Sequence, residues 1–157
     1  MQDKKMNIRK IGFALMVMAL SSCFSTKPMD TGALGLILEV DESAKFVDSL
    51  PTRVTILDDF NQRIELKKFD RINNTDENIG VAILDSARNA GLDLNQLEPR
   101  RVKTQTVTGS YLLGKGELVG GFIGDGSSDG YFVRIKFKPD FVSDAENVME
   151  SIKYKKE

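Results

Sequence analysis

The chain has 157 residues, of which 41% are hydrophobic and 29% charged, with a formal net charge of −1. This composition is typical of a globular protein with one core, and its balanced charge argues against a nucleic-acid partner. The chain has no His and one Cys, which excludes His-based catalytic triads, His metal sites, intramolecular disulfides and thiolate zinc clusters. No cofactor is predicted.

The first 22 residues have the layout of a secretory signal peptide. Basic residues from Lys4 to Lys10 precede an uncharged apolar run from Ile11 to Leu20, and small residues follow. Ten residues span about 15 Å as a helix, against about 30 Å of hydrocarbon, so a permanent transmembrane helix is not expected. Removal of residues 1–22 leaves 18 basic and 22 acidic residues, a net charge of −4.

The sequence Leu20-Ser21-Ser22-Cys23 is similar to the lipobox of bacterial lipoproteins, in which Leu at −3 and two small residues precede a lipidated Cys. The resemblance covers residues 1–23. It implies that signal peptidase II cuts before Cys23 and that the Cys23 side chain carries a diacylglyceryl group. It predicts a membrane-lipid partner through acylated Cys23, and a place in the bacterial cell envelope.

A short tether over residues 23–32 is predicted to join this anchor to a single globular domain over residues 33–157. The nine residues 24–32 reach at most about 30 Å when fully extended, so the domain should sit close to the membrane. Phe24 stands at +2, where inner-membrane lipoproteins carry a retention Asp. The outer membrane is therefore favoured in a Gram-negative cell. Residues 24–157 carry no further family resemblance.

An α+β fold is predicted, with an antiparallel sheet of about five or six strands and two main helices packed on it. Alternating apolar residues over 33–40 predict the first strand. Its partner in the sheet stays open and is either the hairpin or the meander that follows. After it, Asp41 is expected to cap a short helix through Phe46 and Val47 that ends before Pro51.

A β-hairpin and a helix come next. Strands are predicted over 52–57 and 63–69, on either side of a polar turn. The helix is expected to begin at Asn74 and to end at Gly91. Its inner stripe is predicted to consist of Ile79, Ile83, Ala87 and Ala90, widened by Val81 and Leu84.

The C-terminal half predicts a three-stranded meander over 101–113, 117–123 and 131–137. A capping box, formed by Ser143 and Glu146, is then expected to begin the second helix. The inner face of this helix is predicted to consist of Ala145, Val148, Met149 and Ile152.

Eight of the thirteen glycines fall between Gly109 and Gly130, within the meander. They do not match the dinucleotide fingerprint, because Val119 stands where Gly is needed and a strand follows instead of a helix. Tight turns, and close packing of another backbone or a bulky side chain, are the favoured explanation. The alternative is a ligand groove on the sheet, lined by Tyr111, Gly120, Gly121 and Phe122.

Asp125, Ser127 and Asp129 stand at positions 1, 3 and 5 of a calcium-type loop, with Gly130 at position 6. Position 12, which should be a bidentate Glu, is the cation Lys136. A polar hairpin turn is therefore favoured over a weak calcium site.

Asp58 and Asp59 would form the carboxylate pair of a hydrolase if the turn brought them together, with one of the two pKa values raised. Adjacent strand residues point to opposite faces, however, so capping of the turn around Asn61 is favoured.

The sequence thus favours a membrane-anchored envelope lipoprotein without enzymatic activity, whose domain binds a protein partner or supports an assembly. One alternative is a glycan or peptidoglycan hydrolase, which would need two acids about 5–10 Å apart in a cleft. The other is a ligand-binding or adhesive lipoprotein that uses the glycine-rich meander, with calcium as a possible aid.

Overall fold

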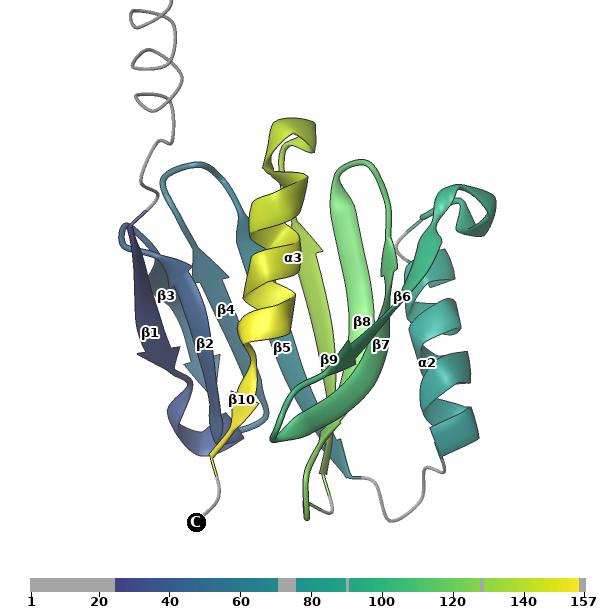
Figure 1. Ribbon diagram of the computed structural model, residues 1–157, viewed down its shortest axis with the longest axis horizontal. Helices are drawn as coiled ribbons and strands as arrows, with labels where there is room; N and C mark the ends of the chain where they lie inside the picture. Colours follow the sequence, from purple (N-terminus) through teal and green to yellow (C-terminus); the bar gives the residue numbers. More distant parts are fainter. Residues whose placement is uncertain (1–24, 71–75, 90, 128, 156–157) are drawn as a thin grey trace, which may run out of the picture.

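The computed structural model describes residues 25–70, 76–89, 91–127 and 129–155. It confirms the α+β class, but ten strands form two sheets in place of the five or six strands expected in one (Figure 1). A three-stranded sheet has the order β1-β2-β10 and a seven-stranded sheet the order β3-β4-β5-β9-β8-β7-β6. The strands of the smaller sheet are β1 (Thr26–Asp30), β2 (Leu36–Asp41) and β10 (Lys153–Tyr154). Those of the larger sheet are β3 (Lys45–Leu50), β4 (Arg53–Leu57), β5 (Arg63–Asp70), β6 (Glu98–Lys103), β7 (Val107–Leu113), β8 (Glu117–Gly124) and β9 (Asp129–Lys136).

The smaller sheet changes the predicted start of the domain. Strand β1 pairs antiparallel with β2, from Thr26 opposite Asp41 to Asp30 opposite Ile37. Residues 26–30 therefore belong to the sheet and not to the tether predicted over 23–32. The expected strand over 33–40 begins later, at Leu36, and it pairs with β1 and β10 rather than with the hairpin or the meander.

Strand β3 replaces the short helix predicted after Asp41, and that prediction is wrong. The Asp41 carboxylate accepts hydrogen bonds from the backbone N–H and the hydroxyl of Ser43, which closes a turn instead of capping a helix. Strand β3 then pairs with β4, with a bulge between Phe46 and Asp48. Strand β3 is at the edge of the sheet, and its side chains Phe46, Val47 and Leu50 are exposed.

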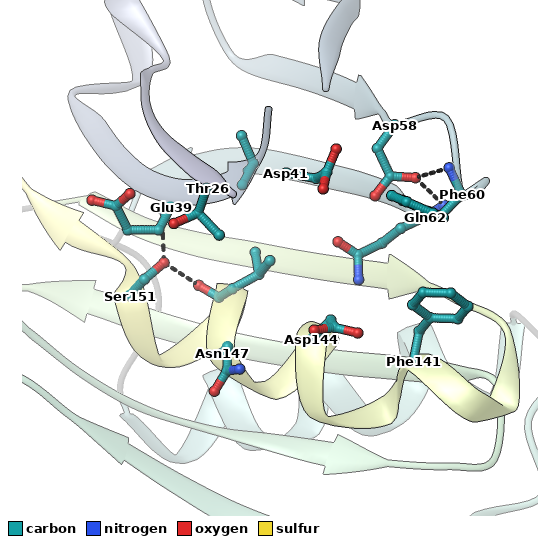
Figure 2. Close-up of a pocket in the computed structure, with 12 residues that line it drawn as sticks. Thr26, Glu39, Asp41, Asp58, Phe60, Gln62, Phe141, Asp144, Asn147 and Ser151 are labelled. Atoms are coloured by element: carbon teal, nitrogen blue, oxygen red, sulfur yellow. Dashed lines mark hydrogen bonds between the residues drawn. The ribbon is translucent and has the colours of Figure 1, made fainter. Parts of the chain in front are cut away.

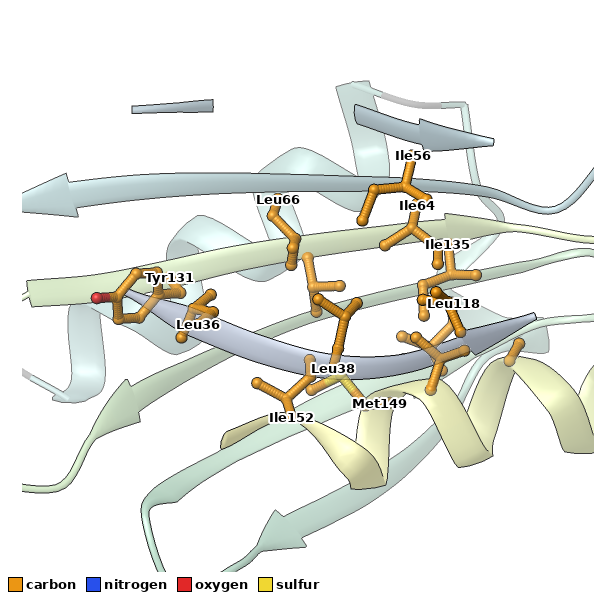
Figure 3. Close-up of a cluster of buried hydrophobic side chains, with 14 of the residues drawn as sticks. Leu36, Leu38, Ile56, Ile64, Leu66, Leu118, Tyr131, Ile135, Met149 and Ile152 are labelled. Carbon is orange, nitrogen blue, oxygen red and sulfur yellow. The ribbon is translucent and has the colours of Figure 1, made fainter. Parts of the chain in front are cut away.

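The main core lies between the two sheets and is closed by helix α3 (Val142–Ser151) (Figure 3). The predicted inner face of this helix is confirmed, because Ala145, Val148, Met149 and Ile152 are all buried. The predicted capping box is wrong. The helix begins at Val142, directly after the 3₁₀ turn Pro139–Phe141, and no side chain caps it.

Helix α2 (Asp76–Asn89) covers the opposite face of the larger sheet, over β8 (Figure 1). Ile83 and Ala87 are buried there, as predicted, and Ile83 packs with Val119. Val81 and Leu84 do not widen the stripe, since they are 52% and 39% exposed. Asn74, Ala90 and the side chain of Ile79 lie outside the described residues.

The predicted hairpin is present as β4 and β5, and the meander is present as β7, β8 and β9. The long extended stretch expected over 101–113 is divided in two by a turn in which Thr104 Oγ1 accepts a hydrogen bond from Val107 N. Its first part is β6, which adds a fourth strand to the meander. Within the described ranges, no helix is long and apolar enough to cross a membrane.

Candidate functional site

A pocket of about 360 Å³ lies between strand β2, the β4–β5 turn and helix α3 (Figure 2). Strand β1 contributes its first residue, Thr26, to the wall. The Phe60 and Phe141 rings lie at one end, with their centroids 5.4 Å apart and their planes tilted by 33°. Four acids line the pocket, namely Glu39, Asp41, Asp58 and Asp144. The other polar lining side chains are Thr26, Gln62, Asn147 and Ser151, so that no basic residue is among those described there.

Asp58 holds the β4–β5 turn in shape. Its Oδ1 accepts hydrogen bonds from the backbone N–H of Phe60 at 2.9 Å and of Gln62 at 2.8 Å. Asn61, between them, takes a left-handed conformation with φ +63°. The predicted turn-capping role is confirmed. Asp59 is exposed and does not line the pocket, so the hypothetical Asp58–Asp59 carboxylate pair is wrong.

The acids of the pocket repel one another. Burial raises the pKa of Asp58 above its usual 3.8, and the nearby charges of Asp41 and Asp59 raise it further, against the lowering effect of the two backbone hydrogen bonds. Burial also raises the pKa of Asp144, with Asp41 as the second cause. This arrangement brings together acids from β2, from the β4–β5 turn and from α3, which local sequence patterns did not link.

Gln62 is one of several polar lining residues that the sequence did not mark. Its side chain is only 5% exposed, and it points into the pocket (Figure 2). Among the residues that the structure describes, its amide group has no hydrogen-bond partner. A glutamine next to a turn is ordinary in a sequence, so only the tertiary structure identifies it.

The raised pKa of Asp144 predicts a stabilising substitution. In Asp144→Asn we expect the free energy of unfolding at pH 7 to rise by at most about 1 kcal/mol, because Asp144 is partly exposed and solvent screens its charge. Because the pKa of Asp144 is higher in the folded state, protonation of this carboxyl stabilises the folded protein. This stabilisation is complete below the ordinary pKa of 3.8, and it is lost as the pH rises through the folded-state pKa.

The gain of Asp144→Asn should therefore vanish at about pH 3, where the wild-type carboxyl is protonated as well. Urea denaturation at both pH values measures it, and Glu150→Gln, an exposed acid on the same helix, is the matched control. A gain that is equal at both pH values would contradict an electrostatic origin.

The aromatic side chains Tyr111 and Phe122 of the glycine-rich meander lie in the core and do not line a groove. Tyr111 is 2% exposed and Phe122 1% exposed, and the Phe122 ring stacks on Tyr131 at 5.3 Å. A Cβ on Gly120 would lie 2.7 Å from the Cβ of Tyr111, so this glycine makes room for the aromatic side chain on the neighbouring strand. The groove predicted from Tyr111, Gly120, Gly121 and Phe122 is wrong, because the two aromatic side chains fill the core.

The Tyr111 hydroxyl also explains why Glu146 does not form the predicted capping box. It donates a hydrogen bond to Glu146 Oε1 at 3.1 Å, so the Glu146 side chain ties α3 to β7 instead of capping its own helix. Burial, aided by the Glu146 carboxylate, raises the pKa of Tyr111 to about 12, and the phenol stays a donor at any physiological pH.

The loop predicted as a turn or a weak calcium site is a turn in the structure. The Asp129 carboxylate forms an ion pair with Lys68 at 2.5 Å, and the Ser127 hydroxyl accepts a hydrogen bond from Asp129 N. Gly126 takes a φ of +75°, which a turn requires. Within the described part of the chain, Asp125 and Asp129 belong to no group of three or more acid or Cys side chains placed to hold a metal ion.

The lipobox residues Leu20, Ser21, Ser22 and Cys23 lie outside the described residues, so their prediction rests on the sequence. No family model matches the chain. No curated protein matches it either. Among solved structures, the chain is similar to the solution structure of cyanobacterial PsbP (CyanoP) from Synechocystis sp. PCC 6803.

That similarity has a TM-score of 0.51 at 8% sequence identity, over 85% of this chain and 95% of the cyanobacterial chain. At this identity the match concerns the fold alone. The chain therefore has an α+β fold similar to that of the cyanobacterial PsbP protein.

Proposed function

We propose that this protein is a lipid-anchored binding module of the bacterial cell envelope, which holds a protein partner at the membrane surface. The support for the anchor is the lipobox ending at Cys23, and Phe24 favours the outer membrane of a Gram-negative cell. The support for binding is the pocket. Some of its polar side chains, such as Asp144 and Gln62, make no hydrogen bond to another described residue and are left to bind a partner.

One observation carries the proposal, namely the position of Thr26. This residue lines the pocket and stands only three positions after Cys23 in the sequence. Three residues span at most about 11 Å, so a lipid on Cys23 would keep the pocket next to the bilayer. The chain is fixed at this point, because Ser25 O accepts a hydrogen bond from Glu42 N at 3.0 Å.

In-cell crosslinking of the tagged chain, followed by mass spectrometry, tests the proposal. We expect one dominant protein partner that is captured by the wild-type chain and lost in the Cys23→Ala chain, because the partner is met at the membrane. Capture of the same partner in equal yield from Cys23→Ala would mean that the partner binds without the lipid anchor. Absence of any partner from both chains would overturn the proposed function.

A glycan hydrolase is the second candidate. The observation in its favour is that Asp58 and Asp144 share the pocket and both have a raised pKa, as a general acid does. Turnover of peptidoglycan by the purified chain, lost in Asp144→Asn, would favour it over a binding module. In that case the crosslinked material should contain glycan strands.

A further inference from the structure

The side-chain amide of Gln62 is the starting point. The side chain is only 5% exposed, and its amide makes no hydrogen bond to a described residue. Among the described residues no fully buried side-chain N or O atom lacks a hydrogen-bond partner, so the remaining exposure of Gln62 lies at its amide, which is reached through the pocket. Figure 2 shows the amide turned into the pocket, toward the space between Asp41 and Asp144. Water, or a ligand that enters the pocket, is therefore expected to pair with this amide.

The charges that line the pocket indicate the sign of the charge that a ligand should carry. Asp58 uses Oδ1 for the two turn hydrogen bonds, and in the described structure its Oδ2 makes none. The Asp144 carboxylate likewise has no hydrogen bond to any described residue. Glu39 and Asp41 face the same space from β2, and the residues described there include no Lys or Arg. A cation would offset the repulsion among these acids, whereas an anion would add to it.

The spacing and shape of the site argue against a metal ion. A calcium ion needs several oxygens within about 2.6 Å, and no three described acids are close enough together to provide them. The acceptors are instead distributed around a pocket of about 360 Å³ with two phenyl rings at one end. A guanidinium group has five donors in a planar fork and stacks on aromatic faces, which suits dispersed acceptors better than a compact ammonium does.

We propose that this pocket binds the guanidinium group of an arginine side chain of the protein partner, with Asp58, Asp144 and the Gln62 carbonyl as acceptors. The inference rests on the proposed binding function of the same pocket. The pocket is open at its rim, since Phe60 is 38% exposed and Asn147 is exposed, which admits a side chain from another protein.

Isothermal titration of the purified full-length chain in detergent tests this inference. The ligands are N-acetyl-arginine amide, the neutral isostere N-acetyl-citrulline amide, and N-acetyl-lysine amide. We expect arginine to bind at least about tenfold more tightly than citrulline, and more tightly than lysine. Equal binding of arginine and citrulline, or no binding of arginine, would overturn the inference.

Two variants locate the site. Gln62→Met keeps the volume but removes the amide, and we expect arginine to bind about fivefold more weakly. The melting temperature should not fall, because no native hydrogen bond is lost. Asp144→Asn should weaken arginine binding by about tenfold. The matched control is Glu150→Gln, which changes an acid on the same helix outside the pocket and should leave binding unchanged.

Other outcomes separate the possible explanations. A large fall in stability of Gln62→Met with unchanged arginine binding would make Gln62 structural and overturn the inference. A pentapeptide with one central arginine and two glycines on each side should bind at least as tightly as N-acetyl-arginine amide. If the pocket bound ethylguanidinium but not the pentapeptide, the guanidinium group could not come from an arginine of a protein partner, and the inference would be overturned. Because titration needs no anchor, a failed titration with successful in-cell capture refutes this inference and leaves the proposed function standing.

Discussion

Leu38→Ala is expected to lower the free energy of unfolding by about 2–5 kcal/mol, the range observed for such truncations in protein cores. Leu38 lies on β2 and is fully buried between the larger sheet and α3 (Figure 3). It belongs to the same buried core cluster as Met149 of α3 and Ile152, which directly follows that helix. Truncation therefore opens a cavity at the point where both sheets and the helix meet, and the β-sheet frame can close it only in part.

The matched control is Leu50→Ala, which removes the same atoms from the exposed edge strand β3, where Leu50 is 47% exposed. That substitution should change stability by no more than about 0.5 kcal/mol. Chemical denaturation measures both, with the m-value as a check that unfolding stays two-state. Similar losses for the two variants would contradict the burial of β2 between the larger sheet and α3.

Cys23→Ser is expected to abolish lipid attachment and to leave the leader uncleaved. Each buried methylene contributes about 0.8 kcal/mol to membrane binding, and one acyl chain binds only marginally, so two or three chains on Cys23 would account for stable anchoring. Without the thiol there is no site for the diacylglyceryl group. We expect no incorporation of labelled palmitate, accumulation of a precursor that is larger by residues 1–22, and loss of the mature form from the membrane fraction.

Ser22→Ala is the control for this prediction. It keeps a small residue at −1 and should be lipidated and cleaved like the wild type. Incorporation of palmitate into Cys23→Ser, or a mature amino terminus elsewhere than at position 23, would refute the lipobox. The folded domain should have the same stability in all three chains, because it begins after this segment.

Local periodicity was enough to predict several elements of this protein. Alternation of apolar and polar residues predicted the β4–β5 hairpin and the meander, because each strand has one face on the core. Spacing of three and four residues predicted the buried face of α3 from Ala145 to Ile152. The Asp58 turn was predictable for the same reason, since its hydrogen bonds reach only two and four residues along the chain.

What the sequence determined by itself therefore consists of short-range features: individual strands, the helix face and the turn. The signal at Cys23 stays a prediction from the sequence. Tertiary structure alone decided the features that need partners distant in the chain. Pairing with β4 made residues 45–50 a strand where a capped helix was expected, and pairing with β2 drew residues 26–30 into a second sheet. The pocket arises in the same way, because Asp41, Gln62 and Asp144 meet only when β2, the β4–β5 turn and α3 pack together.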